Sequence, residues 1–255
     1  MVKNYLIGAV RPVIKMWYPG PNGVTVDNPR WNIALQGYDE MYDVSRASAR
    51  KFLAGDWEEI KYTAPVLNAK LYQIGQWYMI KELWFREPCN ILIATADTMF
   101  VRPTEIFGKF DEFRLFNYTD PRGHHDLTCY GQGHYFNNSV AYYPANMNKQ
   151  TWELGERRMA DWFTHDQADW DCGQLIDNHM FWSQEMPDEQ RLRPDLNWFM
   201  GQREISEYSL AQSQQWNNNC PFDTTKIIHV AGSRGAVLAA KLMKDMAQHI
   251  GLEGY

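Results

Sequence analysis

The spacing of hydrophobic and polar positions changes repeatedly along the chain, and the changes predict an alternation of strands and helices. Short apolar runs rich in β-branched residues indicate strands, and apolar residues three and four apart indicate amphipathic helices. In the first half these patterns predict strand, helix, strand, helix and strand at 5–10, 37–53, 57–63, 68–85 and 91–94. Elements alternating at this spacing favour βαβ units and a parallel sheet.

Regular patterns are sparser in the second half of the chain. Strands are predicted at 113–118, 135–143 and 227–231, and helices at 150–163, 174–182 and 235–250. Three segments read as irregular: the Pro- and Gly-containing stretch 11–30, the turn-rich stretch 119–133, and the Gln- and Asn-rich stretch 195–220. No repeat or linker divides the sequence. We therefore expect one α/β domain over 1–255 with a mixed, mostly parallel sheet flanked by helices.

Composition narrows the class of protein. The 255 residues, 45% of them hydrophobic, are enough for a substantial core. A formal net charge of −6, with no run of Lys or Arg, argues against a nucleic-acid partner. No apolar run approaches the length of a membrane span, and the first residues do not resemble a signal peptide. Four widely spaced cysteines form no metal motif or disulfide framework. We expect a soluble, cytoplasmic protein with reduced thiols.

Candidate chemistry comes from polar residues inside or beside buried strands, where they cost free energy unless they are satisfied. Asp97 ends the apolar run 91–94, Asn138 belongs to a polar interruption of the strand 135–143, and His229 interrupts the strand 227–231. Carboxylate and imidazole ligands suit a divalent ion such as Mn²⁺. Each residue also has a simpler interpretation, since Asp97 could cap a turn and His229 could be a core histidine. A metal cluster of His124, His125 and His134 is a further alternative, without a recognised ligand spacing.

Several motifs, in order from residue 69 to residue 235, resemble those of retaining glycosyltransferases of the GT-A fold, the group of glycogenin and the bacterial lipopolysaccharide galactosyltransferases. The matching segments are Lys70-Leu71, Thr95-Ala96-Asp97 with 99–103, the run 136–140, Asp177-Asn178, 196–198, and His229 with Gly232 and Arg234. The resemblance implies a Rossmann-like GT-A domain, with a nucleotide-binding half at about 1–110 and an acceptor half at about 111–255. It also implies transfer of a hexose from a nucleotide sugar, UDP-linked, to a glycan or protein acceptor.

The family's functional residues, carried over by motif, give a candidate site. A divalent ion, Mn²⁺ or Mg²⁺, would be held by Asp97 and His229 and would neutralise the leaving diphosphate. Asp177, Asn178 and Asn138 would lie near the anomeric carbon, with Asp177 either a nucleophile or an electrostatic support. From sequence alone, Asp177 could instead be a helix N-terminal acid. The nucleotide sugar would contact Gly8, Ala9, Val10, Lys70, Thr95, Ala96, Asp97, Asn197, Gly232 and Arg234.

Two departures from the family pattern leave rival interpretations open. Thr95 stands where the first acid of the Asp-x-Asp motif belongs, and Arg234 is the cation nearest to the place of the phosphate-binding lysine. Both favour an alternative in which a degenerate relative binds glycan or nucleotide without turnover. A sugar-nucleotide pyrophosphorylase is a third possibility, but residues 8–12 lack the Gly-rich loop which that chemistry needs.

Overall fold

The computed structural model describes residues 1–9, 29–63, 69–111, 113–117, 136–164, 197–200, 226–230 and 236–255. Its helices are α1 (Pro29–Phe52), α2 (Ala69–Arg86), α3 (Lys149–Thr164) and α7 (Ala236–His249). Its strands are β1 (Lys3–Ala9), β2 (Glu58–Tyr62), β3 (Cys89–Ala94), β4 (Thr98–Phe100), β5 (Arg114–Asn117), β6 (Phe136–Tyr143), β7 (Asn197–Met200) and β8 (Ile227–Val230).

The main sheet has the strand order β2-β1-β3-β6-β5. Strand β1 pairs in parallel with both β2 and β3, whereas β6 runs antiparallel to β3 and to β5. Four of these five described strands therefore point the same way, and β6 is reversed. A second, three-stranded sheet has the order β4-β8-β7. The expected fold class, an α/β domain with a mostly parallel sheet flanked by helices, is confirmed.

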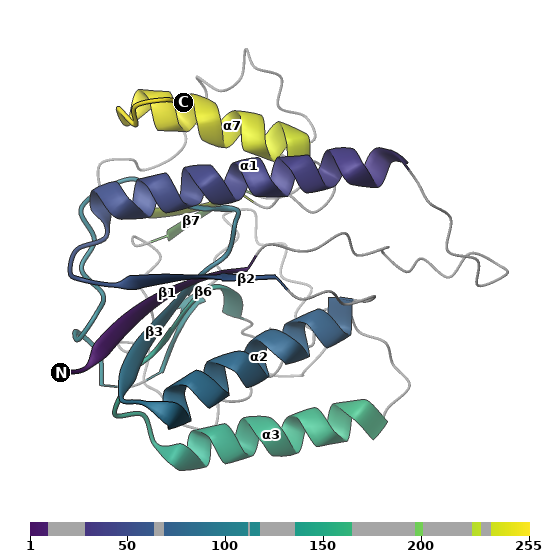
Figure 1. Ribbon diagram of the computed structural model, residues 1–255, viewed down its shortest axis with the longest axis vertical. Coiled ribbons are helices and arrows are strands. Elements are labelled where there is room, and N and C mark those ends of the chain that lie inside the picture. The colour runs from purple at the N-terminus through teal and green to yellow at the C-terminus, as the bar shows by residue number, and fades with distance from the viewer. Residues whose placement is uncertain are drawn as a thin grey trace, which may run out of the picture.

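Helices cover both faces of the main sheet, as Figure 1 shows: α1 and α7 lie on one side, and α2 and α3 lie on the other. Successive strand residues point to opposite faces, so Ile7 and Ile93 pack in the core beneath α2 and α3. Their neighbours Leu6 and Leu92 pack in a core that includes α1 residues. Since all six residues of β3 are buried, this strand is the centre of the molecule.

Three elements differ from the sequence expectations. Helix α1 begins at Pro29 rather than at Gly37. Proline suits the first turn of a helix, and Gly37 is accommodated as a buried residue inside it. Strands β4 and β7 were not expected, because strands of three or four residues carry too little periodicity and form here by pairing with β8. The helix predicted at 174–182 lies outside the described residues.

Two further observations concern membrane spans and cysteine chemistry. Among the described helices, none combines the length and the apolar character needed to cross a membrane. Cys89 is a buried free thiol, and burial raises its pKa to about 12. A thiol in that state is neutral and chemically inert at ordinary pH. The other three cysteines lie outside the described residues.

Candidate functional site

The turn Thr95–Asp97 joins the two sheets, because it connects β3 of the main sheet to β4 of the second one. The carbonyl of Thr95 accepts hydrogen bonds from the backbone N–H and the hydroxyl of Thr98, at 3.1 and 2.7 Å. The N–H of Thr95 donates to the carbonyl of Ser139 in β6, at 2.9 Å. The turn therefore has a defined shape at the carboxyl end of a central strand, where ligands of open α/β sheets bind.

Asp97 and His229, which are far apart in sequence, meet at this turn. Strand β4 pairs with β8 in a register that sets Thr98 opposite His229, and the N–H of Val230 donates to the carbonyl of Asp97 at 2.7 Å. In consequence Nε2 of His229 lies 3.4 Å from Oδ2 of Asp97. The two side chains are only 7% and 17% exposed, so their mutual electrostatic interaction is weakly screened.

The hydroxyl of Thr95 donates a 2.6 Å hydrogen bond to Oδ1 of Asp97. One carboxylate oxygen of Asp97 therefore faces Thr95, and the other faces His229. A threonine hydroxyl cannot replace an aspartate charge, but it can fix the rotamer of the neighbouring carboxylate. This is the role of the groups that surround and orient metal ligands in many proteins.

The Asp97 and His229 pair supplies one anionic oxygen and one imidazole nitrogen, a donor set that fits Mn²⁺. Within the described residues, no group of three or more His, Cys, Asp or Glu side chains is gathered in a metal-binding arrangement. An ion bound to Asp97 and His229 alone would leave coordination positions for water or phosphate oxygens. That arrangement is common for divalent ions that act together with nucleotide phosphates.

Gly8 lies near the carboxyl end of β1, where the sheet meets helix α1. A Cβ built at this position would overlap Cε2 of Tyr42 and would lie 3.1 Å from Cζ of Arg46. Both side chains come from α1 and are buried. The missing side chain therefore allows α1 to pack against the end of β1. This packing is a structural reason for glycine at a position that is also an expected nucleotide contact.

We expect Gly8→Ala to lower the free energy of unfolding by about 1–3 kcal/mol, because the added methyl group must displace the Tyr42 ring. Equilibrium denaturation in urea measures this loss. The matched background is Tyr42→Leu, in which the obstructing ring is gone and the cost of Gly8→Ala should fall clearly. An equal cost in both backgrounds would show that the contact with Tyr42 does not constrain position 8.

A buried arginine on α1 is the prominent residue that the sequence analysis missed. Arg46 is 1% exposed, and its Nη2 donates to the carbonyl of Ala94, the last residue of β3, at 2.5 Å. The same nitrogen donates to the hydroxyl of Ser45 at 3.1 Å. Burial lowers the pKa of Arg46 to about 10, a shift opposed by the charges of Tyr42 and Glu59. A possible signal was its position, four residues after Tyr42 and among the small residues at 45 and 47–49.

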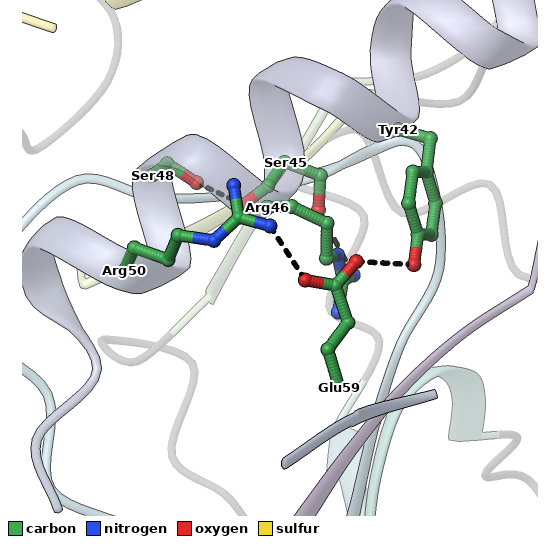
Figure 2. Close-up of polar contacts among 6 residues, drawn as sticks. All are labelled: Tyr42, Ser45, Arg46, Ser48, Arg50 and Glu59. Carbon is green, nitrogen blue, oxygen red and sulfur yellow. Dashed lines mark hydrogen bonds and ion pairs between the residues drawn. The ribbon is translucent and has the colours of Figure 1, made fainter. Parts of the chain in front are cut away.

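Figure 2 shows the polar side chains that surround Arg46. The carboxylate of Glu59, on β2, accepts hydrogen bonds from Tyr42 and Arg50, both at 2.7 Å. Burial and the hydrogen bond to Glu59 raise the pKa of Tyr42 above its usual value. Arg46 forms no ion pair with a carboxylate in the described part of the chain; its Cζ lies 5.1 Å from the centre of the Tyr42 ring.

The remaining predicted residues are only partly described. Ala9 ends β1, Lys70 lies in the first turn of α2, Asn138 lies in β6 and Asn197 begins β7, but their side chains are outside the described part. Ala96 is buried within the turn. Several residues lie wholly outside the described residues: Val10, Asp177, Asn178, Gly232, Arg234 and the histidines 124, 125 and 134. Of the predicted site, the turn with Asp97, His229 and Gly8 is therefore the part with known geometry.

The fold and this site define an α/β protein with a carboxylate and imidazole pair at the junction of two sheets. No model of a known protein family matches the chain, and no curated protein matches it significantly.

Solved structures that are similar to the chain include two glycosyltransferases. One is a glycosyltransferase involved in the glycosylation of the major capsid of PBCV-1, with 9% identity and a TM-score of 0.46, covering 96% of this chain and 99% of that one. The other is the apo-form glycosyltransferase GlyE of Streptococcus pneumoniae TIGR4, with 11% identity and a TM-score of 0.47, covering 98% of this chain and 63% of that one. Both TM-scores lie below 0.5, so these likenesses carry no functional conclusion.

Proposed function

We propose that this protein is a glycosyltransferase that moves a hexose from a nucleotide sugar, UDP-linked, to a glycan or protein acceptor. One observation carries the proposal. Asp97 and His229, selected from the sequence as joint metal ligands, have side-chain atoms 3.4 Å apart although they belong to distant segments. Ligand atoms about 2.0–2.2 Å from one zinc-sized ion lie about 3 Å from each other, so the pair needs little adjustment to share an ion.

The proposed roles follow from the chemistry of each side chain. Asp97 supplies a charged oxygen, His229 supplies a neutral nitrogen, and Thr95 keeps the carboxylate in position through its 2.6 Å hydrogen bond. A divalent ion, Mn²⁺ or Mg²⁺, when bound there, would stabilise the charge that develops on the departing diphosphate. Lys70 and Arg234 would add positive charge near the phosphates. In this proposal Asp177, Asn178 and Asn138 lie beside the sugar. The nucleotide base contacts Gly8, Ala9 and Val10.

The test is a panel of nucleotide sugars, incubated with the full chain in EDTA and again with added Mn²⁺. We expect one UDP-hexose to release UDP, by hydrolysis or by transfer to an added glycan, with Mn²⁺ and not with EDTA. If no nucleotide sugar binds at millimolar concentration, the proposal is wrong. If EDTA does not change the rate of turnover, the transferase activity is supported and the role of the metal ion is wrong.

Thr95 favours a second candidate function, in which the domain binds a nucleotide or glycan but does not turn it over. The Thr95 hydroxyl gives the site one charge fewer than a pair of aspartates would, which weakens its hold on a divalent ion. In the same panel this function predicts binding of UDP or of a glycan with no release of product. Isothermal titration calorimetry beside the activity assay separates the two functions.

A further inference from the structure

Side chains of helix α1 form hydrogen bonds to the backbone on both sides of the turn that carries Asp97. Arg46 donates to the carbonyl of Ala94, which directly precedes the turn, at 2.5 Å. Ser48 accepts a hydrogen bond of 3.0 Å from the N–H of Phe100, three residues after Asp97. The Ser48 hydroxyl is itself oriented, because it donates to the carbonyl of Ser45 at 2.7 Å. Both side chains are buried, at 1% and 0% exposure.

Stability alone is a poor explanation for Arg46. Within the described part of the chain, its Nε and Nη1 atoms are buried without a hydrogen-bond partner, and no carboxylate pairs with the side chain. A buried charge with unmet donors costs free energy, and an apolar side chain of similar volume often packs there at no loss. Costly local arrangements of this kind are expected near functional sites. Of the two hydrogen bonds that Arg46 makes to described residues, the shorter one reaches the strand end that leads into Asp97.

We propose that Arg46 and Ser48 are positioning residues, which fix the Thr95–Asp97 turn so that the Asp97 carboxylate is presented to a divalent cation together with His229. This inference rests on the proposed function, since the cation is the one that the transferase would use. Arg46 acts through the backbone of Ala94, and Ser48 acts through the backbone of Phe100. Neither residue touches the ion or the sugar in this scheme.

Direct binding of Mn²⁺ to the full chain, followed by electron paramagnetic resonance of the free ion, tests the proposal. The measurement is made with and without UDP, for the wild type, Arg46→Met, Arg46→Lys and Ser48→Ala. Loss of a group that orients a metal ligand weakens metal affinity about 10- to 100-fold. We expect such a loss for Arg46→Met, about a tenfold loss for Ser48→Ala, and partial recovery in Arg46→Lys, whose ammonium can still donate to Ala94.

A variant on the same helix serves as the control. Arg50→Ala removes the ion pair with Glu59, but Arg50 is largely exposed and, within the described residues, makes no hydrogen bond to the Ala94–Phe100 segment. It should bind Mn²⁺ as the wild type does. Thermal unfolding of each variant shows that it is folded at the assay temperature, and Ser48→Ala keeps the test open if Arg46→Met does not fold.

Each outcome decides a different question. Wild-type protein that binds neither Mn²⁺ nor UDP overturns the proposed function and this inference with it. If the wild type binds Mn²⁺ and either Arg46→Met or Ser48→Ala binds it equally well, with lower thermal stability as the only change, the positioning role is wrong. The proposed function is then left intact. Where the wild type also turns over a nucleotide sugar, a positioning role predicts that the Mn²⁺ concentration for half-maximal rate rises in parallel with the binding constant.

Discussion

Replacing Asp97 with Asn is expected to lower the rate of sugar transfer about a thousandfold at a fixed Mn²⁺ concentration. A metal that stabilises a leaving group contributes several kcal/mol to the transition state, and about 4 kcal/mol corresponds to this factor. Asn keeps the size of the side chain and an oxygen that can accept the hydrogen bond from Thr95. It removes the charge that an ion beside His229 needs. Initial rates of UDP release at saturating donor measure the effect.

Two further variants make this result interpretable. Asp39→Asn changes an exposed carboxylate on α1 that pairs with Lys61, and it should leave the rate unchanged. Thr95→Val removes the hydroxyl that orients Asp97 but keeps the charge, and we expect about a tenfold loss, as for other groups that orient a metal ligand. If Asp97→Asn retains about a tenth of the wild-type rate or more, Asp97 is not the principal ligand and the site must be reassigned.

Much of the fold could be predicted from the sequence, because its central elements have strong local patterns. The apolar run 91–94 lies in β3, which is buried along its whole length, and the helix predicted at 68–85 corresponds to α2. The second sheet could not be predicted in full. Strands β4 and β7 owe their existence to pairing with β8, which is remote from both in sequence. Pairings of this kind leave no periodic signal in segments so short.

The candidate site also contains residues that the sequence indicates and one that it does not. Asp97 stands out because a lone carboxylate interrupts an apolar segment, and His229 stands out for the same reason. Arg46 does not, since an arginine in an amphipathic helix ordinarily lies on the solvated face. It is buried here because Gly8 leaves room for the guanidinium and Ala94 offers a carbonyl to it. Both conditions are tertiary, so the small residues at 45 and 47–49 could indicate close packing of this face of α1 but not the groups that Arg46 contacts there.

The largest expected effect on stability comes from Trp152, on the face of the sheet covered by α2 and α3. Its side chain is fully buried, and its ring stacks on Tyr143 of β6 with centroids 5.3 Å apart and an interplanar angle of 12°. The rings of Trp77 and Trp84, both on α2, approach it to 5.5 and 5.8 Å. Trp152 therefore joins α3 to both α2 and the sheet.

Trp152→Ala should lower the free energy of unfolding by about 3–5 kcal/mol, because it leaves a large cavity where three elements meet. Trp152→Phe is the matched control. Among the described residues the indole Nε1 is buried without a hydrogen-bond partner, so its removal relieves an unmet donor while most of the ring packing remains. Phe should accordingly cost much less than Ala in urea denaturation. Because α1 and the Asp97 turn do not contribute to this cluster, the protein that stays folded should keep its Mn²⁺ affinity in both variants. Equal losses of stability for Phe and Ala would mean that the indole, rather than aromatic packing in general, connects α3 to the sheet.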